Sequence, residues 1–213
     1  MMRGKFIAFE GGEGMGKSTQ AHLLRDYLEK RGIEVVLTRE PGGTPGAEAI
    51  RDLLLHPPGE GWGPQAEALL FAAARADHVA RLIRPAIEEK KWVVCDRFID
   101  SSRAYQGIAG SLGDHTIRRL HEIGSDALLP DLTLLIGADT HEVEKRLRAR
   151  DGGSSDAIGG RDDYYHAAVN SAFEIFAEKE PGRFVRIDGS GTIEEVHSRV
   201  VAAISPLFET TAS

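Results

Sequence analysis

Apolar and polar positions follow two different periods along this chain, and each change of period separates a predicted strand from a predicted helix. Short apolar runs, such as FIAF at residues 6–9 and WVVC at residues 92–95, are typical of buried strands. Segments with apolar residues three or four positions apart predict amphipathic helices. The predicted strands are residues 5–10, 34–38, 92–95, 132–137 and 184–187. The predicted helices are residues 17–31, 45–55, 65–90 with a break near Pro85, 114–124, 140–150, 167–179 and 193–204.

Strands that alternate with helices predict an α/β fold with a five-stranded parallel sheet covered by helices on both faces. We expect a single domain over residues 1–213, of the P-loop type described below. Residues 150–163 are polar and rich in glycine, which predicts a flexible loop. With the end of the preceding helix they form a predicted lid at about residues 148–163. Ligands of such sheets bind beyond the carboxyl ends of the strands.

Composition narrows the class of protein. A hydrophobic fraction of 41% with 28% charged residues is ordinary for a chain that buries a core. The net charge of −7 disfavours a general nucleic-acid binder, and no apolar run approaches the roughly 20 residues of a membrane helix. The single cysteine, Cys95, excludes an internal disulfide and fits a reducing cytoplasm. Because Cys95 lies in an apolar strand, we interpret it as a buried, inert thiol.

The sequence GGEGMGKST after the first strand matches the P-loop pattern, with Gly11, Gly16, Lys17 and Ser18 at the required spacing. Its glycines let successive backbone N–H groups point at phosphate oxygens, and the following helix adds its positive end. Lys17 would reach the β- and γ-phosphates of ATP, and the Ser18 hydroxyl would bind Mg²⁺. The predicted ATP-binding residues are Gly11, Gly12, Glu13, Gly14, Met15, Gly16, Lys17, Ser18 and Thr19.

Phosphoryl transfer needs more positive charge than this loop carries, since its variable positions, residues 12–15, hold no basic side chain. The candidates elsewhere are Arg146, Arg148, Arg150 and Arg161. For Arg146, a solvated helix face that pairs with nearby glutamates is an equally good interpretation. Arg148, Arg150 and Arg161 are predicted catalytic residues that a closing lid would bring to the nucleotide.

Three further stretches make the sequence resemble the thymidylate kinase family. They are TREPGGT at residues 38–44, LFAAAR at 70–75, and DR at 96–97 followed by SS at 101–102 and AYQG at 104–107. The resemblance covers about residues 5–205, and the Asn-Lys-x-Asp segment expected of a GTPase does not occur. It implies an enzyme that transfers the γ-phosphoryl of ATP to dTMP, giving dTDP and ADP, with Mg²⁺ required. It also implies a homodimer.

The resemblance assigns the base and the sugar to particular side chains. Phe71 would stack on the thymine ring, and Arg75 would donate to a base carbonyl. Ser102 or Gln106 would add hydrogen bonds to the base. Tyr105 would crowd the 2′ position of the sugar and so favour deoxyribose. The four-residue spacing from Phe71 to Arg75 places both on one face of a helix.

The resemblance assigns the acceptor phosphate and the metal as well. Arg51 and Arg97 would clamp the monophosphate, with Arg39 and Pro41 beside them, because guanidinium forks suit phosphate. Arg97 would also stabilise the transition state. Glu13 would contact the 3′-hydroxyl of the acceptor.

Asp96, at the end of an apolar strand, would hold Mg²⁺ directly or through water. The predicted metal residues are therefore Ser18 and Asp96.

The lid departs from the family pattern. The Arg-x-Arg pair at residues 148–150 is present, but no Asp-Arg dipeptide follows it. Either Arg161 reaches back with Asp163 in place of a glutamate, or Arg150 serves alone. Two other functions stay open on sequence grounds, a kinase of another nucleoside monophosphate and a nucleotide-binding module without transfer activity.

Overall fold

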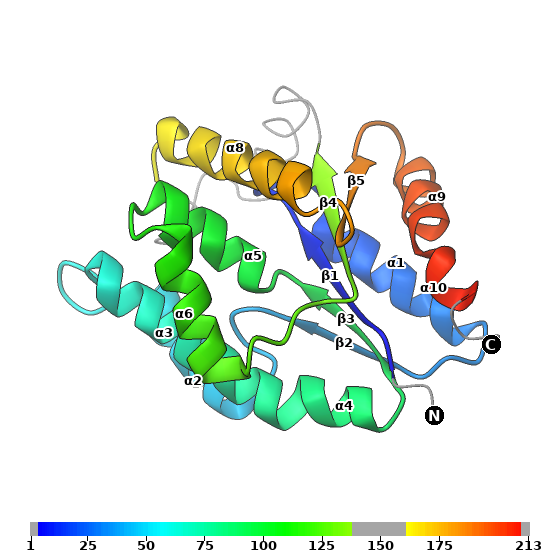
Figure 1. Ribbon diagram of the computed structural model, residues 1–213, viewed down its shortest axis with the longest axis horizontal. Helices are drawn as coiled ribbons and strands as arrows, with labels where there is room; N and C mark the ends of the chain where they lie inside the picture. Colours follow the sequence, from blue (N-terminus) through cyan, green and yellow to red (C-terminus); the bar gives the residue numbers. More distant parts are fainter. Residues whose placement is uncertain (1–3, 138–160, 210–213) are drawn as a thin grey trace.

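The computed structural model describes residues 4–137 and 161–209, and its centre is a parallel sheet of five strands (Figure 1). The strand order is β2-β3-β1-β4-β5. The strands are β1 Phe6–Glu10, β2 Val35–Arg39, β3 Trp92–Asp96, β4 Leu132–Gly137 and β5 Phe184–Asp188. Each lies within a residue of its predicted bounds, and the predicted α/β fold with a five-stranded parallel sheet is confirmed.

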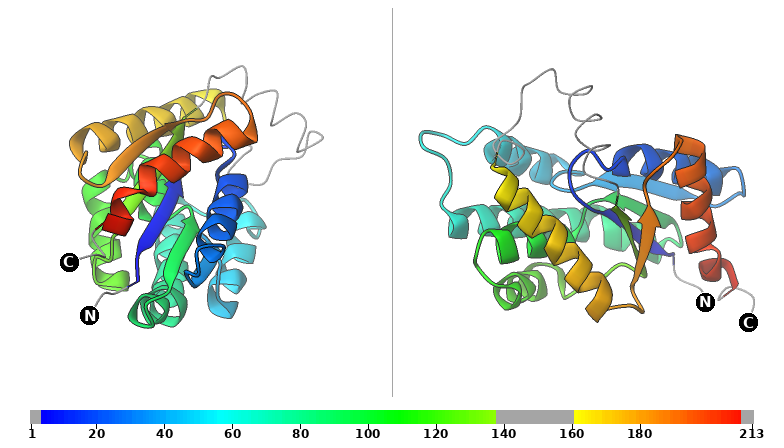
Figure 2. Two further views of the ribbon diagram at one scale, coloured as in Figure 1. Left: turned by 90° about the vertical axis from the view of Figure 1, so that its right-hand side faces the viewer. Right: turned by 90° about the horizontal axis from the view of Figure 1, so that it is seen from above.

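Helices connect the strands and cover both faces of the sheet (Figures 1 and 2). They are α1 Lys17–Glu29, α2 Pro45–Leu55, α3 Pro64–His78, α4 Arg84–Glu88, α5 Ile99–Ser102, α6 Asp114–Ser125, α8 Asp163–Lys179, α9 Ile193–Ile204 and α10 Pro206–Glu209. Two π-helical segments, Val79–Ile83 and Arg103–Ala109, continue α3 and α5. Within the described residues, no helix has the length and apolar character to cross a bilayer.

The central strand β1 shows why the fold has two layers of helices. Ile7 and Phe9 point to one face and pack in a cluster with residues of α1 and α9. Phe6 and Ala8 point to the other face and pack with residues of α3, α4 and α6. All four side chains are fully buried, as expected for a parallel strand with helices on both sides.

Two sequence expectations about helices were wrong, and one helical segment was not predicted. The chain after Arg97 is helical from Ile99 to Ala109, whereas only isolated motif residues were predicted there. Pro85 does not break the long helix. The helix widens into a π-helical segment just before it, which accommodates a residue without an N–H group.

The second wrong expectation concerns the start of the helix predicted at residues 167–179, which begins four residues earlier. Helix α8 begins at Asp163, because the Asp162 side chain caps it by accepting from the backbone N–H of Tyr165 at 2.8 Å. The predicted helix 140–150, with Arg146, Arg148 and Arg150, and most of the predicted lid lie outside the described residues.

The pairing of β1 with β3 positions the two most informative loops of the sequence. Phe9 lies opposite Asp96, so the P-loop after β1 and Arg97 after β3 leave the sheet side by side. Strand β2 pairs with β3 and brings Arg39 beside Asp96. The carboxyl ends of these three adjacent strands therefore form one edge, where the candidate site lies.

Candidate active site

A cavity of about 620 Å³ opens at the carboxyl ends of β1, β2 and β3. All ten residues that were predicted to bind dTMP line it: Glu13, Arg39, Pro41, Arg51, Phe71, Arg75, Arg97, Ser102, Tyr105 and Gln106. The P-loop from Glu13 to Thr19 forms another part of the wall, together with Asp96. The two sets of residues predicted for the two nucleotides therefore share one continuous space.

The P-loop has a backbone that its glycines make possible. Gly11, Gly14 and Gly16 adopt φ angles of 134°, 70° and 83°, a region that disfavours other residues. Gly11 also packs so closely on the carbonyl oxygen of Ile136 that a side chain would collide with it. Gly11 and Gly12 do not line the cavity, so their part in the loop is to shape its start.

Lys17 lies folded back over this loop. Its side chain is buried, and its ammonium group donates to the carbonyl oxygen of Gly12. Burial, with a smaller effect of the nearby Arg97, lowers the pKa of Lys17 to about 7. A phosphate group beside the amine would favour its charged form, so ligand binding is expected to reverse this shift.

Ser18 and Asp96 meet where Mg²⁺ was predicted. The Ser18 hydroxyl donates to one carboxylate oxygen of Asp96, and the other oxygen is buried with no partner in the described part of the chain. An unsatisfied carboxylate oxygen beside a hydroxyl suits Mg²⁺, which usually takes one or two protein ligands and phosphate oxygens. Among the described residues no cluster of three or more His, Cys, Asp or Glu forms a separate metal site.

Arg97 joins the P-loop to the acceptor side of the cavity. One of its terminal nitrogens donates to the carbonyl oxygen of Gly11 at 3.2 Å and to the Ser101 hydroxyl at 3.1 Å. Its guanidinium carbon lies 5.3 Å from the centre of the Tyr105 ring. The backbone of Arg97 has a positive φ of 68°, which turns the chain sharply from β3 into α5.

The end of the cavity that was predicted to bind the base is organised by a buried ion pair. Arg75 donates from Nε to Glu40 and from a terminal nitrogen to the Ser102 hydroxyl, both at 2.7 Å. His78 contacts the second Glu40 oxygen at 3.1 Å and the Thr38 hydroxyl at 2.7 Å. Burial alone would raise the pKa of Glu40, but Arg75 and His78 outweigh this effect and hold that pKa below its ordinary value.

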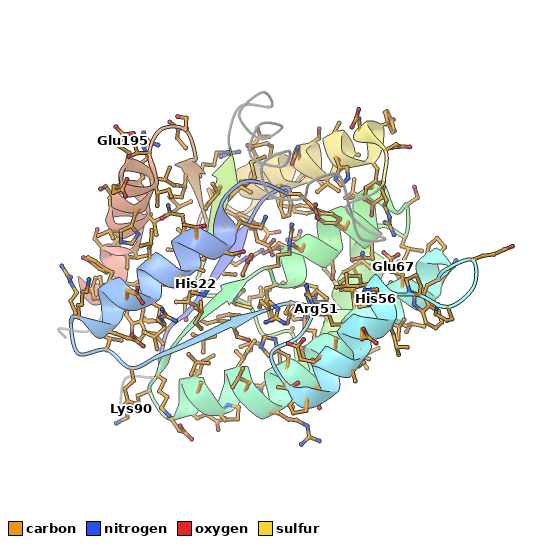
Figure 3. All side chains as sticks on the ribbon, turned by 180° about the vertical axis from the view of Figure 1, so that it is seen from behind. His22, Arg51, His56, Glu67, Lys90 and Glu195 are labelled. Atoms are coloured by element: carbon orange, nitrogen blue, oxygen red, sulfur yellow. The ribbon has the colours of Figure 1, made fainter. Side chains whose placement is uncertain are left out.

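The other two arginines that were predicted to bind the phosphate of dTMP come from β2 and α2. Arg51, labelled in Figure 3, donates to the carbonyl oxygen of Pro41 at 2.8 Å. Arg39 is more exposed and forms an ion pair with Glu48 at 3.0 Å. Both arginines line the cavity, and the fork shape of a guanidinium group suits a phosphate.

Arg161 is not brought to the phosphate loop. It forms an ion pair with Glu67 of α3 and donates to the Tyr165 hydroxyl, beside a second cavity of about 390 Å³. Gln106 lines both cavities and donates to Glu67 at 2.8 Å. The structure therefore places Arg161 near the far side of the predicted thymine-binding wall, and Arg148 and Arg150 lie outside the described residues.

The family model described as Thymidylate kinase matches residues 9–200, which is most of the chain. The chain belongs to the thymidylate kinase family. A thymidylate kinase of Rhizorhabdus wittichii is 53% identical over 207 residues, which cover 97% of this chain and 100% of that protein. A thymidylate kinase of Bradyrhizobium sp. strain ORS 278 is 46% identical, with 95% of this chain and 90% of that protein covered.

A solved structure agrees with these sequences. The crystal structure of thymidylate kinase from Ehrlichia chaffeensis has a TM-score of 0.76 and 34% identity, and covers 95% of this chain and 100% of that one. The predicted family and the predicted activity, an ATP-dependent kinase that phosphorylates dTMP, are confirmed. The alternative of a binding module without transfer activity is not supported.

Several residues that organise this thymidylate kinase site were missed by sequence reasoning. Glu40 lies inside the TREPGGT motif, and Ser101 lies in the SS motif at residues 101–102, but neither was assigned a role. Glu67 gave no signal, because its partners Gln106 and Arg161 are 39 and 94 residues away. Glu10 did give a signal, since it is a carboxylate at the end of an otherwise apolar buried strand.

Proposed function

We propose that this thymidylate kinase holds ATP on the P-loop and dTMP on the opposite wall of the same cavity, and moves the γ-phosphoryl group directly between them. The supporting observation is the single 620 Å³ space lined by both sets of residues. A phosphate oxygen of dTMP forms a bond to the γ-phosphorus, and the bond from that phosphorus to the β,γ-bridging oxygen breaks. ADP takes the electron pair, so no covalent enzyme intermediate is needed.

The charged residues of the cavity are proposed to act on the migrating group. Lys17 and Arg97 stabilise the negative charge that spreads over its oxygens, and both lie at the junction of the two walls. Arg51 and Arg39 bind the phosphate of dTMP by their guanidinium forks. The predicted contributions of Arg148, Arg150 and Arg161 from a lid remain proposals.

The other side of the cavity is proposed to select the acceptor. Phe71 stacks on thymine, while Arg75, held by Glu40, donates to a base carbonyl. Ser102 and Gln106 add hydrogen bonds to the base, and Tyr105 excludes a 2′-hydroxyl. Glu13 contacts the 3′-hydroxyl of the sugar. A site that pairs the polar edge of one base rejects acceptors that lack this edge.

Mg²⁺ is proposed to bind at Ser18 and Asp96, the pair whose oxygen atoms fit it. When bound, the ion neutralises charge on the phosphates of ATP and helps to hold them in line. We also propose that the enzyme is cytoplasmic, because its single cysteine is reduced and buried.

A homodimer is proposed from the family resemblance. We also propose a single domain over residues 1–213 with a lid at about residues 148–163. Exposed apolar side chains on the packed helices α3 and α6, Leu69 and Ile123, supply surface that a second copy would cover. Light scattering on the purified enzyme tests this proposal, and a monomer at micromolar concentration would contradict it.

The acceptor assignment is tested by ADP release with ATP and a panel of dTMP, dUMP, dCMP, AMP and GMP. We expect the highest kcat/KM for dTMP. A preference for a purine nucleotide would contradict the placement of the base against Phe71 and Arg75. The role of Tyr105 is tested in the same panel with Tyr105→Phe, which keeps the ring and removes only the hydroxyl.

A further inference from the structure

Glu10 is the last residue of β1 and directly precedes the P-loop, yet no step of the proposed mechanism uses it. Its side chain is completely buried. One carboxylate oxygen accepts from the backbone N–H groups of Phe98 at 2.9 Å and Ser101 at 3.0 Å. The other accepts from the Ser101 hydroxyl at 2.6 Å. Three hydrogen-bond donors therefore satisfy this buried carboxyl group, and they fix its position at the edge of the site.

The first consequence concerns the helical stretch from Ile99 to Ala109. The residue at its N-cap position is Phe98, whose side chain has no acceptor for the free N–H groups of the first turn. Glu10 supplies that acceptor from another strand, 88 residues earlier in the chain. The same stretch carries Tyr105, so the start of this stretch is held by a carboxyl group at the edge of the P-loop.

The second consequence concerns Arg97. The Ser101 hydroxyl has one proton, which it gives to Glu10, so its lone pairs are left to accept from other donors. Arg97 uses one of them at 3.1 Å, and the same nitrogen donates to the carbonyl oxygen of Gly11. The Glu10 carboxyl group therefore orients the Ser101 hydroxyl. Through this hydroxyl it also sets the position of the Arg97 guanidinium group.

We propose that Glu10 is a positioning residue for phosphoryl transfer: through Ser101 it fixes the Arg97 guanidinium against the first residue of the P-loop. The inference rests on the role of Arg97 in the proposed function. It means that the donor side and the acceptor side of the cavity share one buried carboxyl group. A change at Glu10 then alters the geometry of transfer without touching either nucleotide.

The electrostatic surroundings support a functional reason for an acid at this position. Burial, and then the neighbouring carboxylate of Asp100, raises the pKa of Glu10 to about 7, although Arg97 acts in the opposite direction. Lys17 also faces it across the loop. Burial therefore disfavours the ionised form of Glu10, whereas the hydrogen bonds from Ser101 and Phe98 lower its pKa and favour the ionised form.

The test compares Glu10→Gln, Ser101→Ala, Arg97→Ala and the double variants in single-turnover and steady-state assays with saturating ATP and dTMP. Gln keeps an acceptor for the two N–H groups but turns an NH₂ group toward the Ser101 hydroxyl, which then loses its acceptor. Ser101→Ala keeps the backbone N–H contacts to Glu10 and removes the hydroxyl that links Glu10 to Arg97. Glu174→Gln, in an exposed ion pair on α8, is the control.

We expect Glu10→Gln to lower kcat about 10- to 100-fold, because small misplacements of a catalytic group have effects of this size. Ser101→Ala should lower kcat in the same direction, with the KM for ATP nearly unchanged. In the Arg97→Ala background, neither change should lower kcat further, because the group that they position is gone. A purely structural role would leave the effects multiplicative.

The inference is overturned if Glu10→Gln and Ser101→Ala both keep kcat within about twofold of the parent, or if their effects multiply with that of Arg97→Ala. If Glu10→Gln does not fold, the cycle of Ser101→Ala with Arg97→Ala decides by the same criterion. Full activity of Arg97→Ala alone would remove Arg97 from the proposed mechanism and this inference with it. Multiplicative effects would refute the inference while leaving the proposed function intact.

Discussion

The ion pair of Glu40 with Arg75 allows a sharp test of how this enzyme supports its base-binding wall. The Glu40 side chain, in the loop after β2, is 4% exposed, and the Arg75 side chain, on α3, is 3% exposed. Glu40→Gln preserves the shape of the side chain but removes its charge. Arg75 would then be a buried cation that has lost its ion-pair partner, and the new amide would turn its NH₂ group toward either Arg75 or His78.

The magnitude follows from the burial of the pair. Removing one partner of a buried ion pair is destabilising by about 3–5 kcal/mol, because the other charge stays buried and uncompensated. With a urea slope of about 2 kcal/mol per molar, this corresponds to a midpoint lowered by about 1.5–2.5 M. The matched control is Glu174→Gln, which breaks a pair with Arg186 whose side chains are 54% and 49% exposed. That change should alter stability by less than about 1 kcal/mol.

The assay is equilibrium unfolding in urea at pH 7.5, followed by the KM for dTMP at a temperature where both variants are folded. We expect Glu40→Gln to raise the KM for dTMP, because Arg75 loses the partner that orients it, and to leave the KM for ATP unchanged. If Glu40→Gln is no more destabilising than Glu174→Gln, the buried pair does not hold this wall together and the reasoning fails.

Four further predictions follow from the site. The raised pKa of Glu10 means that the folded state binds its proton more tightly, so stability is full below about pH 4.5 and falls as the pH rises through 7. Between pH 5 and pH 8 the parent should lose about 2–3 kcal/mol relative to Glu10→Gln in urea titrations, and parallel curves would contradict the shift. Phe71→Ala should raise the KM for dTMP about five- to hundredfold, as expected from the loss of about 1–3 kcal/mol of base stacking, and an effect confined to ATP would exclude stacking there. Asp96→Asn should raise the Mg²⁺ concentration for half-maximal rate about tenfold, and an unchanged requirement would remove Asp96 from the metal site. Arg161→Ala should lower kcat more than it weakens dTMP binding, and an unchanged kcat would exclude Arg161 from the mechanism.

The sheet could be predicted from sequence because its signals are local. Each strand is an apolar run such as residues 92–95, and the P-loop glycines lie between the first strand and the first helix. The family motifs then indicated the residues of the cavity wall, although no distance between these residues could be inferred from them. Periodicity, spacing and motif order were enough for these features.

The partners of those residues could not be predicted in the same way. Glu40 meets Arg75 across 35 residues, and Arg161 meets Glu67 across 94, so only the packing of α3 brings them together. The helix from Ile99 was missed because its start has no capping side chain in the local sequence. Its cap comes from Glu10 by tertiary contact, which overrides local propensity.

The pairing of β1 with β3 has a consequence for how this enzyme can vary. Phe9 and Asp96 are opposite each other, and neighbouring side chains of a strand point to opposite faces of the sheet. Inserting or deleting a single residue inside either strand would turn Asp96 away from Ser18 and disrupt both hydrophobic layers at once. The connection between Leu55 and Pro64 has no strand partner, so changes in chain length among related enzymes should gather there and spare β1 and β3.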